Sequence, residues 1–278
     1  MVGGCGEDIS RPDLTGEPPQ SSPICHFDPS MAGTIHGRVI WQGDIPVISP
    51  LLVRATPIGG DALAKRQIQP NPDTPILHSP ERSVGNAVVF LRGVEGATAR
   101  PWSLTPVRVE QRGLQFHIVQ GDLDSPYGFV RRGDAIEMVS RDSYFHALHV
   151  NGASFFTLMF PDPDRPLTRP LKENGVVELT SAAGYYWMRA YLFVDDHPYY
   201  ARTDKEGRFS LEQVPPGQYE VVCWMPNWQE AHHERDPESG LITRLFFRPP
   251  VTLVEKVELG KQESKEVRFS PSMRDFQR

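Results

Sequence analysis

The sequence predicts an all-β protein. Proline (27) and glycine (23) are both frequent among its 278 residues, and they separate many short runs rich in valine, isoleucine, phenylalanine and tyrosine. Such runs, bounded by turn residues, are typical of short strands joined by tight turns. Several runs also alternate apolar and polar side chains with the two-residue period of a half-buried strand. With 278 residues, the chain can form one large domain or two ordinary ones.

The composition excludes some classes of protein. The net charge of −6 and the isoelectric point near 5.9 give no basic surface for nucleic acid. No apolar run approaches the roughly 18 to 20 residues that a membrane-spanning helix needs. The three cysteines, Cys5, Cys25 and Cys223, match no zinc-binding pattern.

The first residues resemble the end of a bacterial lipobox, in which Cys5 of the run Val2-Gly3-Gly4-Cys5 would be the lipidated N-terminus. The polar, proline-rich run that follows predicts a flexible tether over residues 1–30. This interpretation implies an extracytoplasmic location, in the periplasm or cell envelope, with membrane attachment through Cys5. In an oxidising compartment Cys25 and Cys223 could form a disulfide, and the alternative is two buried free thiols.

Strand predictions follow the apolar pattern along the chain. Alternation of Ile35, Val39 and Trp41 indicates a first strand, and the wholly apolar run Ala87–Leu91 suits a strand buried on both faces. A hairpin is expected around Gly113, with the strands Val107–Val109 and Leu114–Val119. Two further strands are expected within Phe129–Val139 and Ala153–Phe160.

The stretch Gly128–Val194 resembles a cupredoxin domain, of the kind found in multi-domain proteins of planctomycete-type bacteria. Its first strand leads to His146 and His149, and a small-residue turn leads into an aromatic strand that ends at Val194. The resemblance places the first histidine ligand of the family on His146 and the methionine ligand on Met188. It places the cysteine ligand on Ala182 and the second histidine on Tyr185.

These last two replacements decide the expected chemistry. A blue-copper centre needs two imidazoles and a thiolate, but Ala182 offers no donor and the Tyr185 phenol is protonated near neutral pH. We therefore expect a cupredoxin-like sandwich without type-1 copper. The alternative is a different, weaker copper site made of His146, His149 and Met188. Residues three apart on a strand face opposite sides, so both histidines reach one ion only if the chain bends there.

The segment after His197 is similar to the carboxypeptidase-regulatory-like (transthyretin-like) β-sandwich. The resemblance is carried by Thr203-Asp204, Gly207 and the Pro216-Gly217 turn, and Gly33–Val39 fits the opening strand of that family. It implies a split sandwich over residues 31–100 and 198–270, with the cupredoxin-like domain inserted at 101–197 and a tail at 271–278. The alternative is two domains in series.

Two further groups are candidate sites. His197 lies in the run Asp195-Asp196-His197 at the predicted domain junction, where it is an acid–base group, a metal ligand or an interface hydrogen-bond partner. A short helix is predicted from Asn227 because Glu230 completes a capping box. Its face would carry Glu230, His233 and Glu234 as possible metal ligands, or as a charged surface.

Aromatic residues gather between positions 185 and 200. They predict either a stacking platform for a flat ligand or packing in the core and between domains. The members of this group are Tyr185, Tyr186, Trp187, Tyr191, Tyr199 and Tyr200.

The sequence as a whole favours a non-enzymatic binding or scaffolding protein of the cell envelope, because no nucleophile motif or phosphate-binding loop is present. Its partner would be an envelope protein or a small ligand. The alternatives are a copper-binding or copper-handling protein using His146, His149 and Met188, and a metal-dependent enzyme using His197 or the group Glu230, His233 and Glu234.

Overall fold

The prediction of an all-β protein is confirmed. The computed structural model describes residues 26–55, 65–238, 240 and 242–277, where the regular structure consists of strands and one short helix. Cys5, Cys25 and most of the predicted tether lie outside the described residues. No helix in the described part of the chain has both the length and the apolar character needed to cross a membrane.

The first sandwich occupies residues 107–195 and consists of two five-stranded sheets, in the orders β10-β16-β15-β12-β13 and β14-β11-β7-β8-β9. Alternate residues of the strands fill the space between the sheets with a closed apolar core, as on the half-buried strand β7. The predicted hairpin around Gly113 is formed by β7 and β8. The strands are β7 (Val107–Arg112), β8 (Gln115–Gln120), β9 (Leu123–Ser125), β10 (Tyr127–Arg131), β11 (Ala135–Ser140), β12 (His146–Gly152), β13 (Phe156–Phe160), β14 (Leu167–Pro170), β15 (Gly175–Ser181) and β16 (Arg189–Asp195).

The second sandwich combines strands from both ends of the chain. A three-stranded sheet has the order β18-β1-β23, and a four-stranded sheet has the order β17-β6-β19-β22. Strands β1 and β6 precede residue 107 and the others follow residue 195, so both chain sections contribute to one core. The strands are β1 (Gly33–Val39), β6 (Val88–Arg92), β17 (Tyr200–Arg202), β18 (Arg208–Val214), β19 (Gly217–Met225), β22 (Val251–Leu259) and β23 (Ser264–Phe269).

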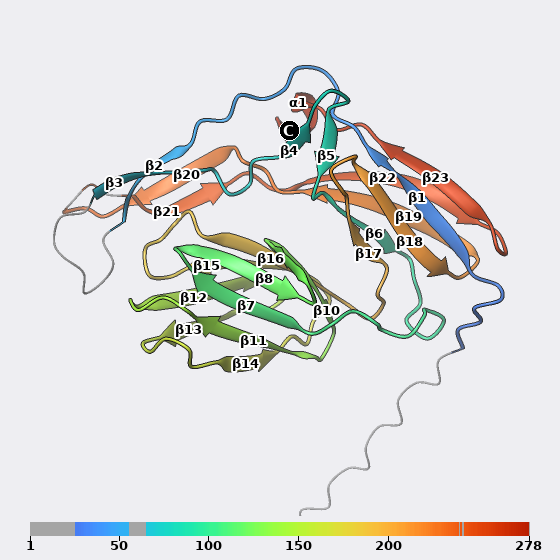
Figure 1. The fold of residues 1–278 in the computed structure, drawn as a ribbon, viewed down its shortest axis with the longest axis horizontal. Coiled ribbons are helices and arrows are strands. Elements are labelled where there is room, and N and C mark those ends of the chain that lie inside the picture. The colour runs from blue at the N-terminus through green and yellow to red at the C-terminus, as the bar shows by residue number, and fades with distance from the viewer. Residues whose placement is uncertain (1–25, 56–64, 239, 241, 278) are drawn as a thin grey trace, which may run out of the picture.

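An aromatic layer joins the two sandwiches, and we call it the seam. It lies between the four-stranded sheet and the outer face of β10 and β16. Figure 1 shows the second sandwich above the first. Trp224 of the second sandwich contacts Tyr191 and Phe193 of the first at ring separations of 4.9 and 5.1 Å. The buried members of the seam are Val88, Phe90, Tyr127, Phe129, Tyr191, Phe193, Val222 and Trp224.

Two hairpins extend from the second sandwich over the first (Figure 1). They are β2 (Leu51–Ala55) with β3 (Lys65–Gln69), and β20 (Glu230–Arg235) with β21 (Ile242–Phe247). The helix predicted from Asn227 is therefore wrong. The capping signal there is local, whereas β20 pairs along its length with β21, and the His232 ring stacks on Phe246 at 4.2 Å. A third, smaller hairpin joins β4 (Ile76–His78) to β5 (Ser83–Gly85).

The C-terminal residues pack onto the second sandwich. The segment predicted as a tail contains the helix α1 (Met273–Phe276), which begins with a capping box between Ser272 and Asp275. Phe276 is fully buried, with its ring 4.3 Å from Trp228 and 5.6 Å from Trp41. The end of the chain thus closes one edge of the core.

Candidate functional site

His146 is a buried histidine of the first sandwich. It begins β12, has no exposed surface, and its Nε2 lies 2.8 Å from Oδ2 of Asp142. A carboxylate accepts hydrogen bonds, so Nε2 carries the proton, and Nδ1 is buried with no hydrogen-bond partner among the described residues. Burial lowers the pKa of His146, and the Asp142 carboxylate opposes this effect.

His149 faces the other side of the same strand. Leu148 and Val150, which alternate with it, are buried in the core of the first sandwich. The His149 ring lies outside, with Nδ1 3.0 Å from Oγ1 of Thr157 and the ring 5.4 Å from that of Phe155. The structure therefore does not bring the two imidazoles together, because β12 continues without a bend between them.

The positions compared with copper ligands are closely packed. The Tyr185 ring lies 5.3 Å from the His146 ring, and Tyr144 lies 5.2 Å from it on another side. Met188 is buried and its backbone N–H donates to the carbonyl of Tyr185. The backbone N–H of Ala182 donates to the carbonyl of Ala147. Two aromatic rings thus pack against His146.

His197 is buried where the chain passes from one sandwich to the other. Its Nε2 lies 3.4 Å from Oδ2 of Asp195, and the backbone N–H of Tyr199 approaches its Nδ1 at 3.4 Å. The ring is stacked with Tyr200 at 5.7 Å. Burial lowers the pKa of His197, which favours the neutral ring. Both polar contacts of His197 are with residues two positions away along the chain.

The predicted group on β20 is exposed. The ring nitrogens of His233 contact the carboxylate of Glu230 and the guanidinium of Arg235, and Glu234 pairs with Arg244 at 3.6 Å. These side chains lie on a surface hairpin, away from the buried His197. Within the described ranges, no three His, Cys, Asp or Glu side chains are grouped as a metal site.

The sequence did not reveal a buried ionic network around Arg189. Its Nε lies 3.4 Å from Oδ2 of Asp73, its NH2 group contacts Glu178 and donates to the Tyr191 hydroxyl at 2.8 Å, and its guanidinium lies 4.3 Å from the ring of Phe247. Burial raises the pKa of Asp73 to about 6, even though Arg189 is beside it. Asp73 ends a segment, residues 70–73, that we call the strap.

A cleft of about 460 Å³ lies beside this network. It is bordered by the strap, by Met188 and Arg189, and by His117, whose Nδ1 lies 2.9 Å from Oδ1 of Asp124. The local signal in the sequence is the Asn71-Pro72-Asp73 run, since Oδ1 of Asn71 accepts the N–H of Asp73 in a tight turn. That signal predicts a turn, but not what the turn covers.

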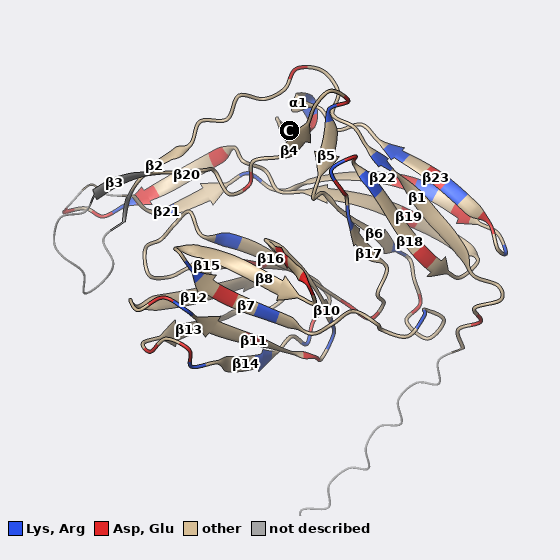
Figure 2. Ribbon diagram, in the orientation of Figure 1, with Lys and Arg blue, Asp and Glu red and all other residues tan. Residues whose placement is uncertain are grey.

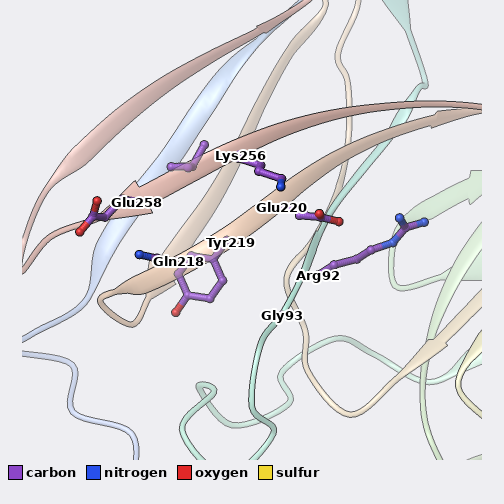
Figure 3. A pocket seen from close by; sticks show the side chains of 8 residues that line it. Arg92, Gly93, Gln218, Tyr219, Glu220, Lys256 and Glu258 are labelled. Atoms are coloured by element: carbon purple, nitrogen blue, oxygen red, sulfur yellow. The ribbon is translucent and has the colours of Figure 1, made fainter.

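A second pocket, of about 610 Å³, lies on the second sandwich. Figure 3 shows its charged side chains, with Arg92, Glu220 and Lys256 on neighbouring strands. Both signs of charge are mixed there, as they are along β7 and β23 (Figure 2). The lining is mainly charged and polar side chains of both signs, and the Tyr219 hydroxyl donates to the carbonyl of Pro215.

A third pocket, of about 600 Å³, opens at the end of the seam. It is lined by Leu104 and Phe129 from the first sandwich side and by Tyr200 and Arg202 from β17. The guanidinium of Arg202 lies 5.6 Å from the ring of Phe129. We call this cavity the seam pocket.

No protein-family model matches the chain. No sequence among the curated proteins matches it either. Solved structures of cupredoxins are similar to part of it. A reduced-state mutant of amicyanin is 16% identical, with a TM-score of 0.26, over 35% of this chain and 96% of that chain. A purple cupredoxin from Nitrosopumilus maritimus is 13% identical, with a TM-score of 0.25, over 32% of this chain and 98% of that chain.

Proposed function

We propose that the protein is a non-enzymatic binding or scaffolding protein of the bacterial cell envelope, whose cupredoxin-like sandwich has lost its type-1 copper site. One observation carries the proposal: Nε2 of His146 is engaged by Asp142, and the ring packs against Tyr144 and Tyr185. These contacts occupy one ring nitrogen of His146 and pack both neighbouring rings against it, as for a structural group of the core. The chain has no thiol at position 182 to complete a blue-copper centre.

The seam and the pockets support a binding role. The aromatic seam fixes the two sandwiches against each other, so cavities at their junction keep their shape. The cleft beside the strap and the seam pocket, at about 460 and 600 Å³, fall in the range of roughly 300 to 1,000 Å³ typical of small-molecule sites. A preformed cavity lined by both apolar and polar groups can select a ligand without any reaction.

The remaining parts of the proposal come from the sequence. The turns at Asp204–Gly207 and Pro216-Gly217 are the reason to treat the second sandwich as a carboxypeptidase-regulatory-like module. Attachment to a membrane through a lipidated Cys5 would place both sandwiches outside the cytoplasm. Mass spectrometry of the protein isolated from its natural host tests this, and an unmodified Cys5 in the mature protein would contradict the anchor.

Copper titration tests the central claim. Purified protein is loaded with Cu(I) and Cu(II), and metal content and visible absorption are measured for the wild type, His146→Ala and His149→Ala. We expect less than stoichiometric copper and no intense colour in all three. Stoichiometric copper that is lost in His146→Ala and kept in His149→Ala would overturn the proposal.

The runner-up function is copper binding, and one observation favours it. Nδ1 of His146 is buried and has no partner in the structure, and such an orphaned lone pair costs free energy unless something binds it. Met188, buried in the same apolar core, is the thioether that could share the ion. In this case Met188→Leu would weaken Cu(I) binding about as much as His146→Ala does.

A further inference from the structure

Arg202 is a partly buried residue that lines the seam pocket. It is the last residue of β17, and its NH1 group donates to the backbone carbonyl of Tyr127 at 3.3 Å. Its guanidinium also faces the ring of Phe129, 5.6 Å away. Both contacts are to the first sandwich, so the arginine reaches from one sandwich to the other.

Arg202 differs from Arg189 in its charged surroundings. Within the described part of the chain, no acidic side chain forms an ion pair with Arg202. Of the two acids that line the pocket, Asp124 is engaged by Arg112 and His117, and Asp204 accepts the backbone N–H of Arg208. The contrast with Arg189 is clear, because that buried arginine has two carboxylates around it.

A cation without a carboxylate partner in this partly buried position loses part of its solvation. Burial lowers the pKa of Arg202, and no neighbouring carboxylate counters that effect. A charge taken from water without a counter-ion loses solvation that one carbonyl and one aromatic face restore only in part. The position is therefore suited to an anion supplied by a ligand, which would complete the pairing.

The residues that line the pocket indicate the shape and polarity of the rest of the ligand. Leu104, Phe129 and Tyr200 form apolar surface next to the guanidinium. Gln120 holds the wall in place, since its amide donates to the carbonyls of Thr105 and Phe129 and accepts the N–H of Phe129. One cation beside rigid aromatic surface fits a flat, singly charged molecule better than a polyanion.

We propose that the seam pocket binds a small aromatic carboxylate, with Arg202 pairing with the carboxylate and the ring lying against Leu104 and Tyr200. This inference rests on the proposed function, because it names the class of ligand that the binding protein would take. The guanidinium fork matches the two oxygens of a carboxylate, and the aromatic contact adds affinity that a bare anion lacks.

Isothermal titration calorimetry of the full chain tests the proposal with 2-naphthoate and its uncharged analogue 2-naphthamide. We expect 2-naphthoate to bind with one-to-one stoichiometry and about 10- to 100-fold more tightly than the amide, the effect of one charge-assisted pair. Arg202→Met should remove this preference, so that both compounds bind equally weakly. Arg208→Gln, an exposed arginine on the next strand, should leave it unchanged.

Thermal unfolding shows whether the variant still folds. Arg202→Met removes an unpaired cation, so we expect a midpoint equal to or above that of the wild type, and 2-naphthoate should raise the midpoint of the wild type alone. A variant that unfolds early would make Arg202 a structural residue and contradict the proposal. The conservative Arg202→Lys should keep part of the preference for the charged ligand, because it keeps the cation without the fork.

Three results would overturn the inference: no binding of 2-naphthoate, equal binding of acid and amide to the wild type, or unchanged binding in Arg202→Met. An aromatic ring beside a carboxylate could belong to a small molecule or to the C-terminus of a peptide. A peptide ending in phenylalanine with a free carboxylate distinguishes these two ligands. Binding of the peptide without binding of 2-naphthoate would contradict a small-molecule ligand. None of these results changes the outcome expected from the copper titration. The proposed function is therefore tested independently of the seam-pocket ligand.

Discussion

Nε of Arg189 lies 3.4 Å from Oδ2 of Asp73, and this ion pair fastens the strap to the first sandwich. Glu178 contacts the same guanidinium, so two carboxylates share one cation. Asp73 is almost fully buried, whereas the Glu178 side chain is 31% exposed. The buried carboxylate is therefore the one that takes up a proton more easily, and burial raises its pKa to about 6.

The pair predicts a pH dependence of stability. A carboxyl group with a raised pKa binds a proton in the folded state that the unfolded state releases, so the free energy of unfolding falls as pH rises from about 4 to above 6. A shift from 3.8 to about 6 corresponds to about 3 kcal/mol. Asp73→Asn should lack this contribution. Part of this effect falls below pH 4, so relative to the variant the wild type should lose about 2 kcal/mol between pH 4 and pH 7.

Urea unfolding of both proteins across this range measures the difference directly, and other titrating groups cancel in the comparison. Asp122→Asn, a change on an exposed turn, is the matched control and should follow the wild type at every pH. A constant difference between the wild type and Asp73→Asn would show that Asp73 does not titrate in this window.

The seam makes a second prediction. Trp224 is 5% exposed and contacts Tyr127, Tyr191 and Phe193 at ring separations of 5.9, 4.9 and 5.1 Å. Trp224→Ala removes the central ring between the sandwiches and should lower the free energy of unfolding by about 3 to 5 kcal/mol. Val254→Ala, on the neighbouring strand and 41% exposed, should cost much less. A loss below about 1 kcal/mol for Trp224→Ala would mean that the seam contributes little.

Much of the fold could be predicted from local patterns. Gly33–Val39 alternates buried and exposed side chains, as the apolar period of that run predicted, and the Gly113 turn fixed the hairpin of β7 and β8. The helix at Asn227 failed because the capping signal describes only neighbouring residues. The contact of His232 with Phe246, which belongs to another strand, outweighs it.

The candidate sites were less predictable, for a physical reason. His146 could be identified from its sequence context, but its partner Asp142 and the rings around it depend on the packing of the loop before β12. Arg202 and Arg189 look alike in the sequence. What distinguishes them is the presence or absence of carboxylates from distant segments, and only the folded chain determines that.

Cys223 provides a third prediction. It is buried in the core of the second sandwich, and burial raises the pKa of its thiol to about 12. The thiolate is the reactive form of cysteine, so native protein at pH 8 should resist alkylation at Cys223, and guanidinium should make it reactive. Peptide mass spectrometry after iodoacetamide treatment measures this residue by itself. Ser210→Cys, on an exposed position of β18, is the positive control. If Cys223 in the native protein is alkylated as fast as this introduced cysteine, the burial of Cys223 is contradicted.

Gly37 tests how tightly β1 is held between its neighbours. It pairs with Val267 of β23, and a Cβ atom added there would lie 1.8 Å from the Val267 carbonyl oxygen and 2.9 Å from the Phe209 ring. The carbonyl belongs to a paired strand and cannot move aside alone. Gly37→Ala should therefore lower the free energy of unfolding by about 2 to 3 kcal/mol, the cost of overpacking.

The matched control is Gly260→Ala. Its added Cβ would meet the end of the flexible Glu263 side chain at 3.0 Å, which can rotate away, so we expect a loss below about 1 kcal/mol. Urea unfolding measures the free energy of unfolding of both variants. It thus compares a Cβ atom that meets backbone with one that meets a side chain. Equal stabilities for Gly37→Ala and Gly260→Ala would show that β1 can separate from β23 at little cost. In that case the strand contributed by the N-terminal section would not be an integral part of the second sandwich.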